Sequence, residues 1–244
     1  MSALPYLLFL LILIVACLYA SVGHGGASGY LALMTLFAIP IATIKPVALV
    51  LNCVVSLIAF IQFYQQGHFN KQLFLFLAIG SVPAAYIGSL IKIDPTLYKQ
   101  LLGALLLLTA IRIAIPLSDK KYELKKANLF ILIFIGACIG LLSGIIGIGG
   151  GIILSPLLII LAYSDIKTTA GISALFIFVN SIAGLIGLMQ QTFLFTSDMN
   201  IMIVIAMIGG IIGAYFGAKQ LHAPLLKKIL AFVLFVAAVK LILI

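Results

Sequence analysis

Two glycine-rich segments are the residues of this sequence best suited to chemistry. Residues 23–26 read Gly-His-Gly-Gly, and residues 147–151 read Gly-Ile-Gly-Gly-Gly. Glycine lets a backbone turn with positive φ and come close to a ligand. A helix that restarts after such a break presents unpaired N–H groups and a partial positive charge, which suit an anion. We therefore predict substrate-binding residues at both breaks, namely Gly23, His24, Gly25, Gly26, Gly147, Gly149, Gly150 and Gly151.

Hydroxyl groups near the two breaks could add hydrogen-bond donors to this site. Ser28 follows the first break and Ser155 follows the second, and we include both in the predicted site. The alternative is that the glycines serve close helix packing, as in small-xxx-small interfaces. One cluster alone would favour packing, but two clusters that each open a short apolar segment favour binding.

One histidine and two lysines lie in or near the breaks. His24 is inside the first break, where the second carries Ile148. Its imidazole could donate to an anion or titrate near neutral pH, or it could be a structural histidine bonded to a neighbouring carbonyl. Lys45 and Lys167 each follow a short apolar segment, and they either reach the membrane interface or attract an anion along its pathway.

Two asparagines, Asn52 and Asn180, fall inside long apolar segments. An unpaired amide would be costly there. Each therefore either forms hydrogen bonds between helices or lines the pathway, and we include both in the predicted substrate-binding site.

Residues that most enzymes and metal proteins need are missing from the apolar segments. The five carboxylates lie in loops or at segment ends, which argues against a proton relay or an acidic cation site in mid-membrane. No cluster has metal-ligand spacing, no nucleophile has a base beside it, and no P-loop is present. We expect no catalytic residues, no metal and no cofactor, and we predict that the protein is not an enzyme.

The composition sets the class of protein that these residues belong to. Of 244 residues, 65% are hydrophobic and 8% are charged, and the net charge is +9. This leaves too little polar surface to cover a globule in water, which excludes a soluble enzyme and a nucleic-acid-binding domain. The basic residues are scattered between apolar runs and fit loops that face anionic lipid. We predict an integral membrane protein whose partner is the lipid bilayer.

Ten apolar segments are expected to be helices, because lipid cannot satisfy an open backbone. The second and seventh are about 14 residues long, shorter than the roughly 20 that cross a bilayer. They either form re-entrant hairpins or cross fully, so the chain has eight to ten membrane segments. The expected ranges are 4–22, 28–41, 46–65, 72–91, 97–115, 128–146, 151–164, 168–190, 199–218 and 224–243.

The two halves of the chain resemble each other. The glycine breaks match at an offset of 124, and residues 85–88 match residues 214–217 at 129. Each unit has five segments, so the second must be inverted, an arrangement typical of secondary transporters. We predict one all-α membrane domain with a first repeat at 1–116, a cytoplasmic basic linker at 117–127 and a second repeat at 128–244. The Lys and Arg distribution places both termini outside.

These motifs resemble those of the sulfite exporter TauE/SafE family of membrane transporters. The resemblance rests on residues 21–30, 45–52, 66–69, 144–156 and 169–180, and it spans essentially the whole chain. It implies transport of small sulfur-containing anions, such as sulfite and organosulfonates, across the bacterial inner membrane. Ile148 stands opposite His24, so a symmetric two-histidine site is not available.

Together these observations predict a secondary transporter of a small anion. We expect it to export a sulfur oxyanion or organosulfonate by alternating access, with the anion held at the glycine breaks. The sequence leaves open whether transport is coupled to H⁺ or Na⁺ and whether the protein forms a homo-oligomer. The alternatives are a passive anion channel and a non-catalytic membrane subunit of a larger complex.

Overall fold

The computed structural model describes residues 4–114, 124–189, 197–219 and 224–243, and within these ranges it is all-α, as predicted. The predicted linker at 117–127 lies outside the described residues except for 124–127. The helices are α1 (Leu4–Ala20), α2 (Ala27–Leu36), α3 (Ile41–Gln65), α4 (Lys71–Leu90), α5 (Pro95–Ala114), α6 (Leu129–Ile146), α7 (Gly151–Ile160), α8 (Ile166–Leu188), α9 (Ser197–Lys219) and α10 (Pro224–Leu243).

The two short helices, α2 and α7, are ten residues long rather than the 14 that the apolar runs predicted. Both end in a Schellman motif, which turns the chain before the apolar run is over. In α7, Tyr163 N–H bonds to Leu158 O at 2.9 Å and Ala162 N–H to Ile159 O at 3.0 Å. The corresponding bonds close α2, and the left-handed position is again an alanine, with φ 55° at Ala38 and 57° at Ala162.

Backbone conformation repeats between the two halves. Positive φ occurs at Gly23, Gly26 and Ala38, and again at Gly147, Gly150 and Ala162, each pair 124 residues apart. The packing repeats as well, because α4 packs on α6 as α9 packs on α1, and α8 packs on α4 as α3 packs on α9. These matches support the repeat, while the inverted insertion of the second half stays a prediction.

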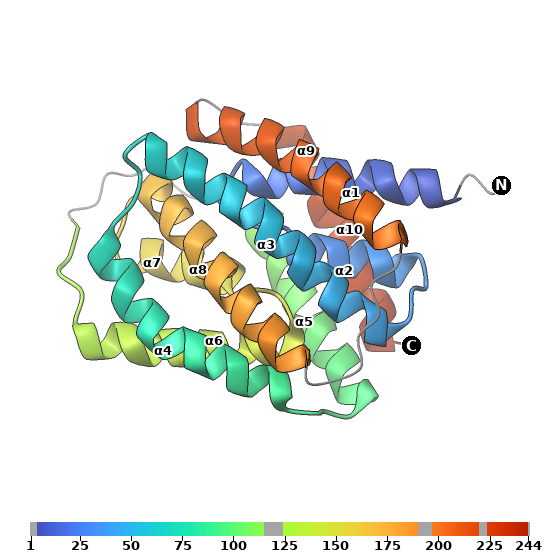
Figure 1. Cartoon of the computed structure of the whole chain (residues 1–244), viewed down its shortest axis with the longest axis horizontal. Helices are drawn as coiled ribbons and strands as arrows, with labels where there is room; N and C mark the ends of the chain where they lie inside the picture. Colours follow the sequence, from blue (N-terminus) through green and yellow to red (C-terminus); the bar gives the residue numbers. More distant parts are fainter. Residues whose placement is uncertain (1–3, 115–123, 190–196, 220–223, 244) are drawn as a thin grey trace.

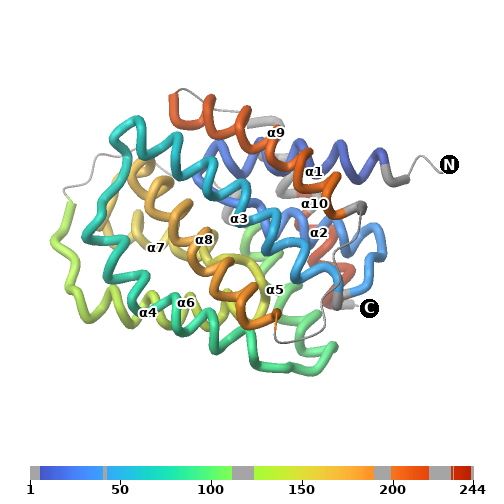
Figure 2. The backbone as a smooth tube through the Cα atoms, in the orientation of Figure 1, coloured from blue at the N-terminus to red at the C-terminus, as the bar shows by residue number. Residues whose placement is uncertain are grey.

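The long helices α3 and α8 lie side by side through the middle of the bundle (Figure 1). In that view α1 and α9 lie above them and α4 and α6 lie below, while α5 packs on α10. The short helices α2 and α7 lie toward opposite ends of the bundle (Figure 2). The glycines of the breaks that precede α2 and α7 are buried.

Two glycine stripes hold the outer helices close. Gly136, Gly140 and Gly144 of α6 lie against the α4 backbone, where an added Cβ would overlap carbonyl oxygens. Residues 209, 213 and 217 of α9 do the same against α1. This is the small-xxx-small packing of membrane helices. From the sequence we considered such packing at the breaks, whereas these glycines lie outside them. The spacing of four residues between successive glycines was a usable signal in the sequence.

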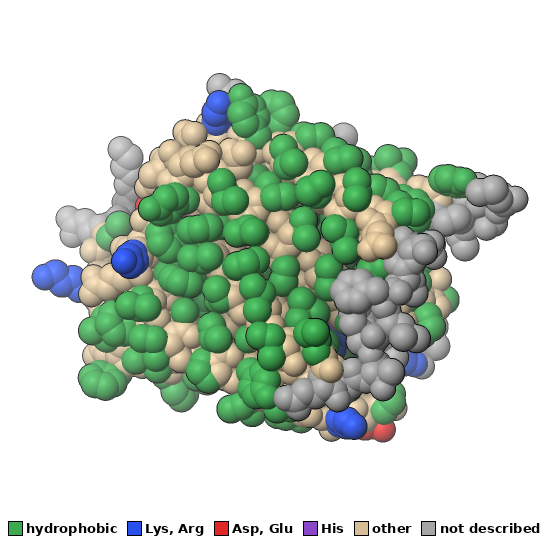
Figure 3. Space-filling view, in the orientation of Figure 1, with side chains coloured by type: hydrophobic (Ala, Val, Ile, Leu, Met, Phe, Trp, Pro, Cys, Tyr) green, Lys and Arg blue, Asp and Glu red, His purple; other side chains and the backbone are tan. Residues whose placement is uncertain are grey.

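The surface of the bundle suits a bilayer. Among the described residues, five helices, α3, α4, α6, α8 and α9, are long and apolar enough to cross a membrane. Large apolar side chains are exposed on them, including Phe130 at 84% and Phe134 at 70%. Hydrophobic side chains cover much of one face, with lysines at its margins (Figure 3). Water would not tolerate so large an apolar surface, whereas lipid does.

Replacing Ala38 with glycine should stabilise the protein. Ala38 is exposed and left-handed, a conformation that costs an L-residue roughly 1–2 kcal/mol and glycine almost nothing. Glycine also makes the unfolded chain more flexible, which offsets part of this gain. Ala38→Gly should therefore raise the melting temperature by about 2 °C. Ala104→Gly, at an exposed position inside α5, should instead lower it by about 2 °C. Equal shifts in the two variants would contradict the role of the left-handed turn.

Candidate functional site

The side chain of Asn52 connects the two glycine breaks. This residue lies in the middle of α3 and is fully buried. Its Oδ1 accepts a hydrogen bond from Ala27 N–H, the first residue of α2, at 3.1 Å. Its Nδ2 donates to Ile148 O in the second break at 3.2 Å and to Ser181 Oγ of α8 at 3.1 Å. Both N–H donors of the amide are therefore used within the protein.

The glycines of both breaks allow this close approach. A Cβ at Gly25 would overlap the Asn52 amide, and a Cβ at Gly149 would meet the other side of the same amide and the Ile177 side chain. Any larger residue at either position would push the breaks away from Asn52. Close packing and a binding role are thus not alternatives here, because the packing is what brings the two breaks together.

The short helices α2 and α7 both begin beside Asn52. Their N-cap residues, Gly26 and Gly150, are left-handed with φ 94° and 79°, and neither has a side-chain cap. The N-terminus of a helix carries unpaired N–H groups and a partial positive charge. Two such ends, one from each half of the chain, therefore meet at the centre of the bundle.

Each helix start also has a buried hydroxyl with no hydrogen-bond partner among the described residues. The Tyr30 OH lies next to Gly26, where a Cβ would be 2.8 Å from it. Ser143, one turn before the end of α6, has its Cβ 3.5 Å from where a Cβ on Gly150 would be, an ordinary van der Waals contact. Both residues are at most 1% exposed. A buried donor without a partner is costly, and an anion at the helix start would satisfy it.

His24 connects the first break to α7 and α8. Its Nδ1 lies 2.9 Å from Val22 O, and because a carbonyl only accepts, Nδ1 carries the proton of this bond. Its Nε2 lies 3.3 Å from Ser155 Oγ, which is 2.7 Å from Ser173 Oγ. The structural bond to a neighbouring carbonyl that we considered is present, and so is a polar contact across the halves.

Ser28 has its own partner in the first half. Its hydroxyl lies 2.6 Å from Tyr19 OH, and the Tyr19 ring packs edge-on against His24. Both tyrosines of this region, Tyr19 and Tyr30, are buried in the core around α2. Neither was predicted from the sequence, although the place of Tyr30 one turn after Gly26 was a usable signal.

The paired lysines lie in different surroundings. Lys45 donates to Ile145 O, in the last turn of α6, at 2.9 Å and packs its stem on Gly147, so it adjoins the second break. Lys167 is exposed in the first turn of α8, and none of the break glycines lies against its side chain. Their matched spacing therefore did not indicate a matched role.

Asn180, like Lys167, does not join the other predicted site residues. Its Nδ2 donates to Phe176 O within α8 at 2.9 Å, and its buried Oδ1 has no partner among the described residues. Ile177, one turn earlier, is the residue that contacts the glycines of the second break. Of the predicted residues, Gly25 and Gly149 lie directly against Asn52, and His24 and Ser155 contact each other across the halves.

The arrangement defines a class of protein: a multi-pass membrane protein with broken helices that meet at its centre, as in transporters. Residues 8–241 match the profile of the family described as "Sulfite exporter TauE/SafE". The chain belongs to this family. It is a membrane transporter of the TauE/SafE type.

Relatives with curated names agree with this assignment. The chain is 33% identical over 239 residues to "Probable membrane transporter protein y4hK" of Sinorhizobium fredii, covering 94% of each chain. It is 30% identical over 223 residues to "Probable membrane transporter protein YdhB" of Bacillus subtilis, covering 87% of this chain and 89% of the relative. No solved structure matches the chain.

Replacing Gly149 with alanine should separate close packing from backbone strain. Gly149 (φ 74°) faces Asn52, Ile177 and Ser181, whereas Gly67 (φ 76°) has open space around it. Gly67→Ala should cost only the strain of a left-handed alanine, lowering the melting temperature by roughly 3 °C. Gly149→Ala adds a steric overlap and should lower it by roughly 10 °C. Similar losses in the two variants would mean that Asn52 does not hold the breaks as tightly as its hydrogen bonds indicate.

Proposed function

We propose that the protein is a secondary transporter that exports a small anion across the inner membrane by alternating access. The anion is a sulfur oxyanion or an organosulfonate such as sulfite. It is held between the starts of α2 and α7, next to Asn52. The TauE/SafE family supports the substrate class, and the relatives' names support transport alone.

One observation carries the anion assignment: two helix N-termini converge, and each has a buried hydroxyl without a partner among the described residues. The remaining N–H groups at the helix starts and the two hydroxyls can each donate to an oxygen of the substrate. A tetrahedral or pyramidal oxyanion presents several acceptor oxygens in different directions, so it can satisfy both ends at once.

The positions of the two described carboxylates support an anion as well. Asp94 and Asp165, the two carboxylates whose surroundings the structure describes, lie in the turns before α5 and α8 and away from the breaks. Hydrogen bonds from the Thr96 N–H and then the Leu97 N–H hold the pKa of Asp94 below its ordinary value. Partial burial raises the pKa of Asp165, but hydrogen bonds from Thr168 and Lys167 outweigh it, so this pKa also lies below its ordinary value. Both carboxylates are therefore ionised at neutral pH, and both serve as helix caps outside the site.

Transport in liposomes tests the proposal directly. Purified protein in liposomes loaded with unlabelled sulfite should accumulate labelled sulfite by counterflow, and the flux should saturate. A passive channel would give no counterflow, and a subunit of a larger complex would give no flux on its own. Chloride and acetate as competitors should leave the flux unchanged if the site requires an oxyanion with several acceptor oxygens.

The two buried hydroxyls allow a sharper test by anion-dependent melting. A ligand that binds only the folded state raises the melting temperature in proportion to its occupancy. Without anion, Tyr30→Phe and Ser143→Ala should melt at or slightly above the wild-type temperature, because each removes an unsatisfied buried donor. With sulfite present, each variant should lose at least half of the wild-type stabilisation.

Ser81→Ala is the matched control for these two variants. Ser81 is also fully buried with a hydroxyl that has no partner among the described residues, but it lies in the α4–α6 interface, far from either helix start in the chain. It should keep the full response to sulfite. The anion site is refuted if Tyr30→Phe and Ser143→Ala respond to sulfite as the wild type does, or if Ser81→Ala loses the response equally.

A further inference from the structure

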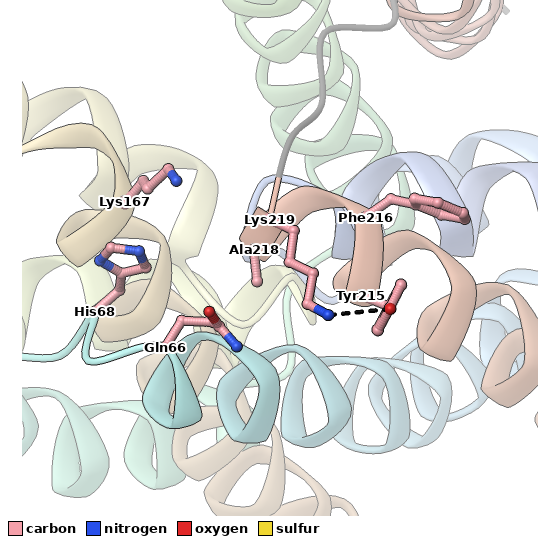
Figure 4. A pocket seen from close by; sticks show the side chains of 7 residues that line it. All are labelled: Gln66, His68, Lys167, Tyr215, Phe216, Ala218 and Lys219. Atoms are coloured by element: carbon pink, nitrogen blue, oxygen red, sulfur yellow. Dashed lines mark hydrogen bonds between the residues drawn. The ribbon is translucent and has the colours of Figure 1, made fainter.

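A second polar region, separate from the breaks, lies at one end of the bundle. An open cavity of about 410 Å³ is lined by the turn after α3, the start of α8 and the end of α9. His68 and Lys167 lie on one side of it, and Tyr215 and Lys219 lie on the other, with Gln66 between them (Figure 4). The volume exceeds what a small oxyanion occupies.

The charged side chains that line this cavity are both cations. The Lys219 ammonium donates to Tyr215 OH at 3.0 Å and lies 4.2 Å from the centre of the Tyr215 ring. This contact positions the exposed ammonium at the cavity wall. Lys167 is exposed, and the nearby Asp165 uses its Oδ1 to cap α8 through the N–H groups of Lys167 and Thr168. The lining thus offers several donors and a positive charge.

The floor of the cavity separates it from the first break by a thin apolar layer. Ala218 lines the cavity and packs with the buried Phe63 and Ala170. Directly behind this layer, Gly23 lies against the Ala170 backbone. On the cavity side, Gly171 lies against the His68 carbonyl. A ligand in the cavity would therefore be one side-chain layer away from the first break.

We propose that this cavity is a second oxyanion-binding site, in which Lys167 and Lys219 collect the anion before it passes the Phe63–Ala170–Ala218 layer. The proposal rests on the anion transport proposed above and adds to it the place where the anion first binds. The exposed Tyr215 and Phe216 beside the cavity also suit the membrane interface. A lipid phosphate could supply the same chemistry as a free anion, so the two sources are tested separately.

Charge removal in proteoliposomes tests the free anion. The double variant Lys167→Gln/Lys219→Gln should raise the KM for sulfite roughly five- to tenfold, with Vmax nearly unchanged, because two exposed charge contacts are lost. The increase should shrink as added salt screens the wild-type cavity. The matched control is Lys125→Gln/Lys126→Gln, which removes two exposed lysines outside this cavity. It should change KM less than twofold.

Anionic lipid is tested by native mass spectrometry of the same three proteins. If a lipid phosphate fills the cavity, the wild type and the control should retain one more phosphatidylglycerol than Lys167→Gln/Lys219→Gln. An effect on KM supports a free anion, and an effect on bound lipid supports a lipid phosphate. If the cavity variant matches the control in both measurements, the cavity is not an oxyanion site.

Failure of the cavity proposal can be told apart from failure of the proposed function. Wild-type protein that moves no anion would refute the transport proposal, while the lipid measurement and anion-dependent melting would still test the cavity. Wild-type transport with a normal KM in Lys167→Gln/Lys219→Gln and no loss of lipid would refute the cavity proposal alone. Tyr30→Phe, at the central site, should lose sulfite stabilisation even where both lysines are intact.

Discussion

The hydrogen bonds of one side-chain amide hold the centre of this protein together. Asn52 accepts from the start of α2 and donates to the second break and to α8, so it connects segments about 100 residues apart in the chain. Such a polar group is tolerated at the centre of a membrane bundle only because each of its donors has a partner. The requirement extends to its neighbours, because Gly25 and Gly149 must lack side chains for the amide to reach both breaks. Those glycines in turn interrupt the helices and leave α2 and α7 short.

Much of the fold could be predicted from the sequence because lipid restricts what an apolar segment can do. Each of the ten apolar runs contains a helix in the part of the chain that the structure describes, and the two that follow glycine breaks are the short ones. The ends of α2 and α7 were predicted too far along, because hydropathy continues through a turn that only backbone geometry reveals. The turn is formed by alanines in a left-handed conformation, Ala38 and Ala162. Glycine is the usual residue at such a position, so the alanines themselves did not indicate a helix end there.

The candidate site was harder to predict, because it depends on which face of a helix meets which neighbour. Asn52 and Asn180 are spaced like equivalent residues, yet Ile177 contacts the second break and Asn180 bonds within α8. Lys45 reaches a break and Lys167 lines a cavity at one end of the bundle. The burial of the Tyr30 and Ser143 hydroxyls, and their lack of partners among the described residues, could be known only from the structure. A sequence repeat preserves the order of the helices. A shift of one residue along a helix, however, turns a side chain toward a different neighbour.

In the alternating-access mechanism proposed here, the bonds of Asn52 divide unequally between the two halves. Its bond to Ala27 joins residues of the first half, whereas its bonds to Ile148 and Ser181 cross to the second. If the halves rock apart, Asn52 stays with α2, and only the two Nδ2 bonds break. Each such bond is worth about 1 kcal/mol net, so the cost is of the size that a bound ligand can offset. The freed N–H donors then face the helix starts, where the anion is held. An anion that takes over these two bonds stabilises the separated state more than the closed one, and this difference in affinity is what couples its binding to the movement of the halves.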